Sequence, residues 1–160
     1  EQRTDVAIRI GPLGDSTLHA RPLCHSRRRV LASPAYLERH GTPRTVEELA
    51  GHSLIGFTQP DSLNDWPLRH ALGERWRIAP SIRASSGDTV RLLALAGEGL
   101  ACLSDFMTDA DRERGDLVEV LAEHRVEVRQ PIHAVYYRNT ALASRIACFL
   151  DYLSEHLRAK

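Results

Sequence analysis

Short apolar runs, each bounded by turn residues, recur along this 160-residue chain and alternate with helix-forming segments. The run Val6–Ile10 is rich in β-branched residues and ends at Gly11 and Pro12, and residues 100–103 form a uniformly apolar run after Gly99. Apolar runs of this kind, bounded by glycine or proline, are typical of buried strands. Their alternation with helices predicts an α/β fold with a mainly parallel sheet that helices cover on both faces.

Local end signals place the helices between these strands. Ser33 and Pro34 are the residue types preferred at a helix N-cap and at the first helical position, and Gly97 is placed to end a later helix. We expect Trp66 and Trp76 to pack the polar, hairpin-like region around them onto the body. The pattern predicts strands over residues 6–10, 29–32, 53–57, 81–84, 100–103, 117–121 and 132–137, and helices over residues 34–40, 46–50, 88–96, 108–115 and 141–158.

The order of these segments predicts two lobes that share the chain. We expect the chain to cross between the lobes near residues 22–25 and again near residues 130–133. Residues 1–25 would then be a remnant of a first lobe, residues 26–130 a second lobe, and residues 131–160 the return strand and C-terminal helix of the first lobe. The first lobe is too small to close its own core, so we expect the chain to be a piece of a larger protein.

The charge balance and hydropathy exclude some classes of function. Lys plus Arg and Asp plus Glu number 21 each, so the formal net charge is zero. A domain that binds nucleic acid by itself normally carries a basic excess on one face, so we expect no direct DNA contact from this segment. No apolar run approaches the ~18 residues of a membrane span, and no signal peptide is recognisable, which favours a cytoplasmic location.

The residues that commonly carry catalysis or metal binding are scattered. The cysteines Cys24, Cys102 and Cys148 have no short mutual spacing, and we expect them to be buried thiols. The sequence has no Gly-x-Ser-x-Gly nucleophile motif, and Gly97 and Gly99 precede a strand instead of following one. The sequence therefore predicts a protein that is not an enzyme and that has neither a metal nor a cofactor.

Two polar segments are candidates for binding. The run Arg27, Arg28 and Arg29 is either a phosphate-binding patch or a solvated hinge and strand edge, and the second interpretation is favoured. The segment from Ser85 to Asp88 lies between a strand and a helix start, where unpaired backbone N–H groups and the helix dipole attract anions. The residues alone leave two interpretations of that segment equally open, a plain helix cap and a ligand site.

Four segments, spread in order over the chain, resemble the ligand-sensing half of LysR-type transcriptional regulators. The first is a strand and turn that lead into a hinge, the second a strand followed by two helices, the third a glycine-punctuated helix, and the fourth a returning strand. They are Asp5-Val-Ala-Ile-Arg-Ile-Gly-Pro and onward to Leu23, Leu31-Ala-Ser-Pro-Ala-Tyr-Leu and onward to His52, Ser85-Ser-Gly-Asp-Thr-Val-Arg-Leu and onward to Leu100, and Ile132-His-Ala-Val-Tyr-Tyr137.

The resemblance implies a fold similar to periplasmic binding proteins and the sensing of a small-molecule effector, possible ligands including organic acids. It also implies a homo-oligomer in which the apolar helix 88–96 contacts a partner subunit, and DNA binding only through an N-terminal helix-turn-helix that this segment lacks. The alternative is a periplasmic-type solute-binding protein that delivers its ligand to a transporter. A secretory leader upstream would support that alternative, and a helix-turn-helix would support the regulator.

Under this resemblance the effector is expected in the cleft between the lobes. Ile10 and Gly11 would contact it from the first lobe, and Ser85, Ser86, Gly87 and Asp88 from the second. Phe57 and Ser104 would line the floor of the cleft, because both lie at the carboxyl ends of predicted strands. Ser104 stands where the family pattern often has proline, which adds a polar group at that point.

Overall fold

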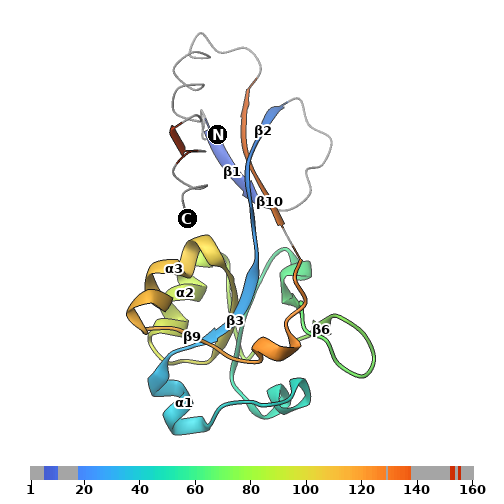
Figure 1. The fold of residues 1–160 in the computed structure, drawn as a ribbon, viewed down its shortest axis with the longest axis vertical. Coiled ribbons are helices and arrows are strands. Elements are labelled where there is room, and N and C mark those ends of the chain that lie inside the picture. The colour runs from blue at the N-terminus through green and yellow to red at the C-terminus, as the bar shows by residue number, and fades with distance from the viewer. Residues whose placement is uncertain (1–5, 11–17, 129, 138–151, 154, 156–160) are drawn as a thin grey trace. The chain divides into compact units, whose positions relative to one another are not determined.

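The computed structural model describes residues 6–10, 18–128, 130–137, 152, 153 and 155, and the chain divides into two compact units (Figure 1). Unit 1 comprises residues 1–26 and 129–160, and unit 2 comprises residues 27–128. Each unit is built around a sheet of its own. The assignment of the two units to the lobes of an effector-binding domain stays a prediction.

The described sheet of unit 1 is antiparallel, with strand order β1-β10-β2. These strands are β1 (Val6–Ile10), β10 (Gln130–Tyr137) and β2 (Leu18–Ser26). The sequence predicted β1 and β10, but it predicted a lobe crossing where β2 runs. The helix expected over residues 141–158 lies mostly outside the described residues, and residues 152, 153 and 155 within it are helical.

The larger sheet belongs to unit 2 and has the strand order β7-β4-β8-β3-β9. Its strands are β3 (Arg28–Ala32), β4 (Leu54–Phe57), β7 (Ile82–Ala84), β8 (Leu100–Ser104) and β9 (Val118–Glu119). The pairings show that β7, β4, β8 and β9 run in one direction and that β3 alone runs against them. The four segments expected to share one sheet therefore do so, and the sheet is mainly parallel.

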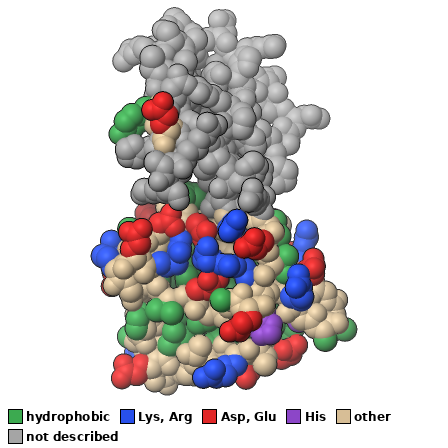
Figure 2. Space-filling model, in the orientation of Figure 1, with side chains coloured by type: hydrophobic (Ala, Val, Ile, Leu, Met, Phe, Trp, Pro, Cys, Tyr) green, Lys and Arg blue, Asp and Glu red, His purple; other side chains and the backbone are tan. Residues whose placement is uncertain are grey.

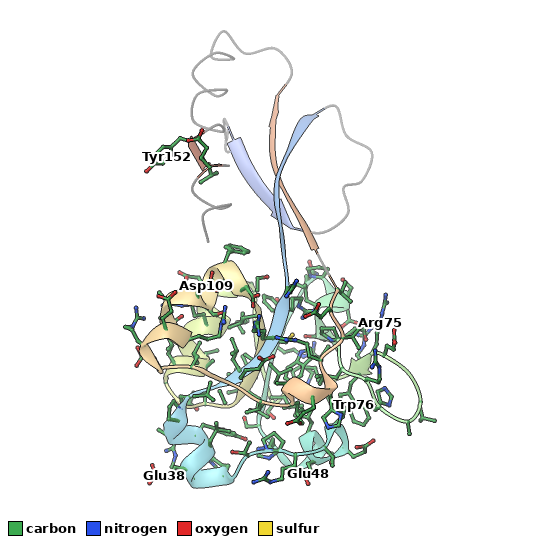
Figure 3. The ribbon with its side chains drawn as sticks, viewed as in Figure 1. Glu38, Glu48, Arg75, Trp76, Asp109 and Tyr152 are labelled. Carbon is green, nitrogen blue, oxygen red and sulfur yellow. The ribbon has the colours of Figure 1, made fainter. Side chains whose placement is uncertain are left out.

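Helices cover this sheet on both faces. One face carries α1 (Pro34–His40), the 3-10 helix η1 (Val46–Gly51) and the small hairpin of β5 (Asp65–Trp66) and β6 (Trp76–Arg77), and the other carries α2 (Gly87–Leu95). Figure 3 shows Glu38 and Glu48, on α1 and η1, well away from Asp109 on the helix α3 (Asp105–Arg114). In the hairpin Trp66 pairs with Trp76, and Trp66 is fully buried, as the sequence predicted.

The expected helix start at Ser33 is confirmed, and two element boundaries differ from the prediction. The Ser33 hydroxyl accepts a hydrogen bond from the Tyr36 backbone N–H at 3.1 Å. Helix α3 begins at Asp105 instead of residue 108. Strand β9 has two residues instead of five, because the chain turns at Leu121, which has a φ of 57°.

Candidate functional site

Three parallel strands of unit 2 end at the same edge of the sheet. Phe57 ends β4, Ala84 ends β7 and Ser104 ends β8, and Phe57 is paired with Ala84. Because β3 runs the opposite way, its first residue, Arg28, lies at this edge too and is paired with Ser104. In open α/β sheets ligands bind beyond the carboxyl ends of the strands. This edge therefore gathers most of the residues that the sequence predicted for the site.

The segment from Ser85 to Asp88 forms the start of α2. Ser85 and Ser86 are exposed, and Ser86 is the N-cap, whose hydroxyl accepts a hydrogen bond from the Thr89 N–H at 3.2 Å. The Ser86 and Thr89 hydroxyl oxygens are also 3.0 Å apart. In the described part of the chain, the N–H groups of Gly87 and Asp88 have no acceptor. The capping role of Ser86 is thus present, and two backbone donors remain available beside it.

Gly87 lies against an apolar surface formed by two other elements. A Cβ built at Gly87 would lie 2.7 Å from Cε of Met107 and 4.0 Å from Cζ of Phe57. Met107 on α3 therefore occupies the space on that side of Gly87. Met107 was not among the expected site residues, because nothing in the sequence relates it to a glycine 20 residues earlier. The exposed polar turn consequently borders an apolar surface of Phe57 and Met107.

An asparagine side chain holds the end of β4. Strand β8 pairs with β4 only as far as Ile55, which is opposite Ala101. Two residues later the Phe57 N–H donates to Asn64 Oδ1 at 2.8 Å, and Asn64 Nδ2 donates to the Phe57 carbonyl at 2.9 Å. Asn64 is buried, so its amide satisfies backbone groups that would otherwise lack partners. It also anchors the 3-10 helix η2 (Asp61–Asn64) at this edge.

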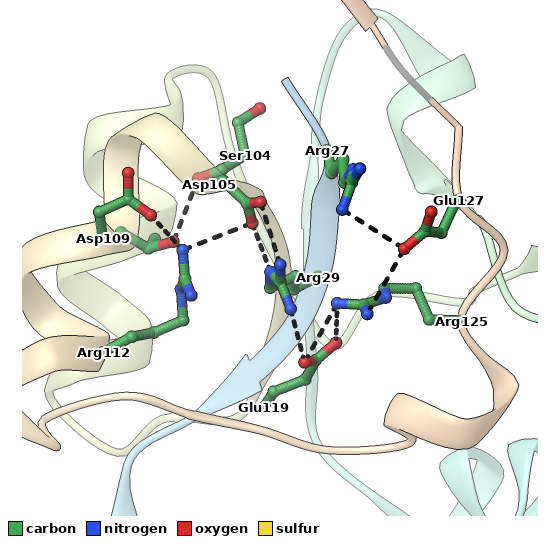
Figure 4. A network of polar contacts seen from close by, with 10 residues as sticks. Arg27, Arg29, Ser104, Asp105, Asp109, Arg112, Glu119, Arg125 and Glu127 are labelled. Atoms are coloured by element: carbon green, nitrogen blue, oxygen red, sulfur yellow. Dashed lines mark hydrogen bonds and ion pairs between the residues drawn. The ribbon is translucent and has the colours of Figure 1, made fainter. Parts of the chain in front are cut away.

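Ser104 is buried, and its hydroxyl does not cap the helix that it starts. It is the N-cap residue of α3, but its side chain makes no capping hydrogen bond. Its backbone carbonyl accepts from the Thr108 hydroxyl at 3.1 Å. In Figure 4 the Ser104 hydroxyl points away from the charged residues drawn around it. Its role is therefore different from that of the capping hydroxyls Ser33 and Ser86.

A network of ion pairs lies beside Ser104 (Figure 4). Arg29 binds Asp105 at 2.6 Å and Glu119 at 2.9 Å, and Arg125 binds Glu119 at 3.0 Å. Glu127 pairs with Arg27 at 3.4 Å. The carboxylate partners rule out Arg27 and Arg29 as a simple phosphate patch, and the partial burial of Arg29 also corrects the expectation of a solvated edge.

The surface of unit 2 reflects the same balance of charge. Figure 2 shows acidic and basic side chains next to one another across the visible face of residues 27–128. Mixed charges of this kind give no extended positive field, which nucleic-acid binding requires. This agrees with the formal net charge of zero for the whole chain.

A second ion pair joins the two helices that start at the candidate site. Arg91 on α2 donates to both carboxylate oxygens of Asp111 on α3, at 2.7 and 2.8 Å, and Arg114 adds a contact at 2.7 Å. The Asp111 side chain is almost fully buried. The hydrogen bond from Arg91 lowers the pKa of Asp111, while burial acts in the opposite direction. The carboxylate therefore stays charged and fixes α2 relative to α3.

The remaining predicted features fall partly outside the described residues. Ile10 ends β1 of unit 1, and Gly11 lies outside the described part of the chain. Cys102 is buried, and burial raises the pKa of its thiol, which disfavours the reactive thiolate. Within the described ranges, no three His, Cys, Asp or Glu side chains come together as a metal site requires, and no helix there has the length and apolar character to cross a membrane.

Similarity to known proteins extends over nearly the whole chain. Residues 1–158 match the family described as LysR substrate binding domain. The HTH-type transcriptional regulator CrgA of Neisseria meningitidis serogroup C is 50% identical over 157 residues, which cover 98% of this chain and 52% of CrgA. The HTH-type transcriptional regulator PtxR of Pseudomonas aeruginosa is 32% identical over 160 residues, which cover 98% of this chain and 50% of PtxR. The chain thus spans about half the length of these curated relatives.

A solved structure shows the same fold. The regulatory domain of CrgA, a LysR-type transcriptional regulator from Neisseria meningitidis, has a TM-score of 0.89 and 50% identity, covering 96% of this chain and 75% of that one. The predicted α/β class is therefore confirmed. The family description and the relatives' names are those of a binding domain and of regulators, which supports the prediction that the chain is not an enzyme.

Proposed function

Because this chain belongs to the LysR substrate-binding domain family, we propose that it is the effector-sensing part of a LysR-type transcriptional regulator. Its fold and family describe a binding module, and its balanced charge leaves DNA contact to another part of such a regulator. Binding of a small molecule would favour one conformation of the domain and so change the geometry of an oligomer on DNA. Such a regulator would act in the cytoplasm.

The turn at the start of α2 carries this proposal. The N–H groups of Gly87 and Asp88 have no acceptor in the described residues, and the exposed hydroxyls of Ser85 and Ser86 lie next to them. Donors at a helix start are suited to a carboxylate or a carbonyl group. We place the effector against this turn and against Phe57, which packs on the same face of the sheet as α2; Ser104 ends β8 at the same edge but faces the other side.

The surroundings of the turn favour a small organic acid as the effector. Backbone N–H groups and hydroxyls would bind its acidic group, and the neighbouring Phe57 and Met107 side chains offer an apolar contact to its carbon skeleton. Ile10 and Gly11, which we predicted to contact the ligand from the first lobe, remain predictions from the sequence. The family and its fold are established independently of this choice of ligand.

The alternative proposed from the sequence was a solute-binding protein that serves a transporter. The curated relatives CrgA and PtxR are named transcriptional regulators, and their similarity covers 98% of this chain, which favours the regulator. The coding sequence upstream distinguishes the two proposals directly. A helix-turn-helix there supports the regulator, and a secretory leader supports the transporter.

The role of Ser86 provides a test of the ligand site. A thermal-shift screen of small aliphatic and aromatic acids would first identify a ligand, and calorimetric titration would then measure its affinity. Loss of one hydrogen bond costs about 0.5–1.5 kcal/mol, or up to about 3 with a charged acceptor, so Ser86→Ala should weaken binding roughly threefold to a hundredfold.

A matched control separates binding from capping. Thr45 is an exposed N-cap at η1, and its hydroxyl accepts from the Glu48 N–H at 3.3 Å. Thr45→Ala should lower stability, as Ser86→Ala also should, by about 1 kcal/mol, without changing affinity. A lowered melting temperature with unchanged affinity in Ser86→Ala would reduce Ser86 to a structural cap and remove it from the proposed site.

A further inference from the structure

Arg28 is a buried cation whose hydrogen-bond partners are all neutral. It is 9% exposed, and its guanidinium donates to the backbone carbonyls of Asp65 at 3.1 Å and Leu63 at 2.6 Å. Its neighbours Arg27 and Arg29 each pair with a carboxylate, but no carboxylate of the described residues lies within ion-pair distance of Arg28. Buried charges in proteins are normally paired with an opposite charge.

The topology places the Arg28 guanidinium at the end of β8. The Arg28 guanidinium on β3 donates to the carbonyls of Leu63 and Asp65. The side chain of Asn64, which lies between these two residues in the chain, accepts from the Phe57 N–H at the end of β4. Because β8 lies between β4 and β3 in the sheet, the segment 63–65 bridges the position where β8 ends.

Ser104, the last residue of β8, presents an unused hydroxyl at the same place. Ser104 and Arg28 are directly opposite in the antiparallel pair, so their side chains leave the same face of the sheet, with Cβ atoms about 4.5–5.5 Å apart. Ser104 is 7% exposed, and its hydroxyl has no partner among the described residues. Among the side-chain nitrogen and oxygen atoms of the described residues, only Arg112 Nε and Arg125 Nε are both inaccessible to solvent and without a hydrogen-bond partner. The Ser104 hydroxyl is not one of them, so it is accessible to solvent.

We propose that Arg28 and Ser104 together form an anion subsite that binds a carboxylate or another small oxyanion. A guanidinium has five N–H donors in a planar fork that matches the two oxygens of a carboxylate, and the two carbonyls occupy only part of it. The serine hydroxyl supplies a further donor. An anion there provides the counter-charge that Arg28 lacks, whereas a neutral ligand does not.

This subsite is separate from the turn at the start of α2. Side chains alternate along a strand, and Leu103, next to Ser104, belongs to the core cluster that packs under α2. Ser104 and Arg28 therefore face the other side of the sheet, where Val30 and Cys102 are buried with Trp66. Either site can consequently fail its test without affecting the other.

The test follows the side-chain Nε–H signal of Arg28 by NMR in the ¹⁵N-labelled chain. Sodium acetate and sodium sulfate are titrated against sodium chloride at constant ionic strength. The subsite predicts a saturable shift of the Arg28 signal with acetate or sulfate that chloride does not produce. Ser104→Ala should weaken that binding about ten- to a hundredfold, through the loss of one hydrogen bond to a charged group.

Two arginine variants complete the test. Arg28→Gln should abolish the saturable response of the Ser104 amide. Arg28→Lys keeps the charge but loses the planar fork of donors, so it should weaken the response, and it serves if Arg28→Gln does not fold. Arg39 also donates to a backbone carbonyl, that of Gly97 at 3.2 Å, so Arg39→Gln is the matched control and should leave the response unchanged. An Arg28 signal that shifts no more than that of Arg39, a response that persists in Arg28→Gln, or an affinity that is unchanged in Arg28→Lys, would overturn the proposal.

Discussion

At the scale of single residues, one hydroxyl links α1 to the segment after η1. The Tyr36 hydroxyl accepts from the Ser53 N–H at 3.2 Å and lies 2.7 Å from His52 Nδ1. The Tyr36 hydroxyl can donate its proton to Nδ1 of a neutral His52 ring, whereas a protonated His52 ring has no acceptor at Nδ1 and can only donate. His40 stacks on the Tyr36 ring, with ring centroids 4.6 Å apart. Protonation of His52 therefore removes an acceptor and adds charge beside His40.

We predict that this contact weakens in acid. Burial and the neighbouring His40 lower the pKa of His52, while Glu48 acts in the opposite direction. The unfolded chain then binds the proton more readily, so the contribution is fully present above the ordinary histidine pKa of about 6.5 and is lost as the pH falls below it. Urea unfolding at pH 8 and pH 5.5 should show this loss, and His52→Asn should reduce it. An equal pH dependence in the variant would contradict the assignment.

Residue roles were predictable where they depend on sequence neighbours and not where they depend on the fold. The caps at Ser33 and Ser86 were recognisable because each bonds a backbone N–H three residues later. Asn64 was not among the expected site residues, because its partner, Phe57, lies on β4 beyond the last residue that pairs with β8. Met107 and Arg28 act through contacts across the sheet edge, and no local pattern marks such contacts.

At the scale of elements, short apolar runs predicted strands correctly, whereas a strand with a more polar sequence was missed. Strands β4, β7 and β8 were predicted because both faces of the sheet bury their side chains. Strand β2 was missed, since it contains Pro22, which is paired with His133 beside a register shift. Proline is tolerated on an edge strand because its missing N–H faces away from the partner, and β2 is an edge of the described sheet.

The ion pair between α2 and α3 gives a prediction at this scale. Asp111→Asn keeps the shape of the side chain but removes the charge that Arg91 and Arg114 neutralise. Because both arginines are partly exposed, we expect a loss of about 1–3 kcal/mol in the free energy of unfolding, measured by urea denaturation. The control is Asp116→Asn, which removes an exposed pair with Arg114 and should cost less than about 1 kcal/mol. Equal losses in the two variants would show that Asp111 does not hold the helices together.

At the scale of the whole molecule, the sequence predicted the α/β class and the mainly parallel sheet. It did not predict that β3 runs against its neighbours, because strand direction depends on how the chain enters the unit. Strand β3 is the first strand of unit 2, and only Arg27 separates it from β2, which belongs to the sheet of unit 1. This reversal brings Arg28 to the edge where the parallel strands end.

We also predict that the intact regulator is a homo-oligomer that uses α2. Val90 is fully buried in unit 2, whereas Leu92 on the same helix is 56% exposed. Leu92→Glu should shift the intact protein toward monomers in sedimentation velocity, because a buried carboxylate would face the partner. Leu72→Glu is the control, since Leu72 is 92% exposed on a different element. An unchanged sedimentation profile for Leu92→Glu, or the same change in both variants, would argue against this interface.

The central claim, that the chain binds a small organic acid at the start of α2, is tested most directly by backbone amide NMR. An acid selected by the thermal-shift screen is titrated into the ¹⁵N-labelled chain, and the shift of every assigned amide is followed. We predict that the Gly87 and Asp88 amides shift most and saturate together, because their N–H groups are the available donors at that helix start. Largest shifts in another region, such as the hairpin of Trp66 and Trp76, or no saturable shift with any acid of the panel, would contradict the claim.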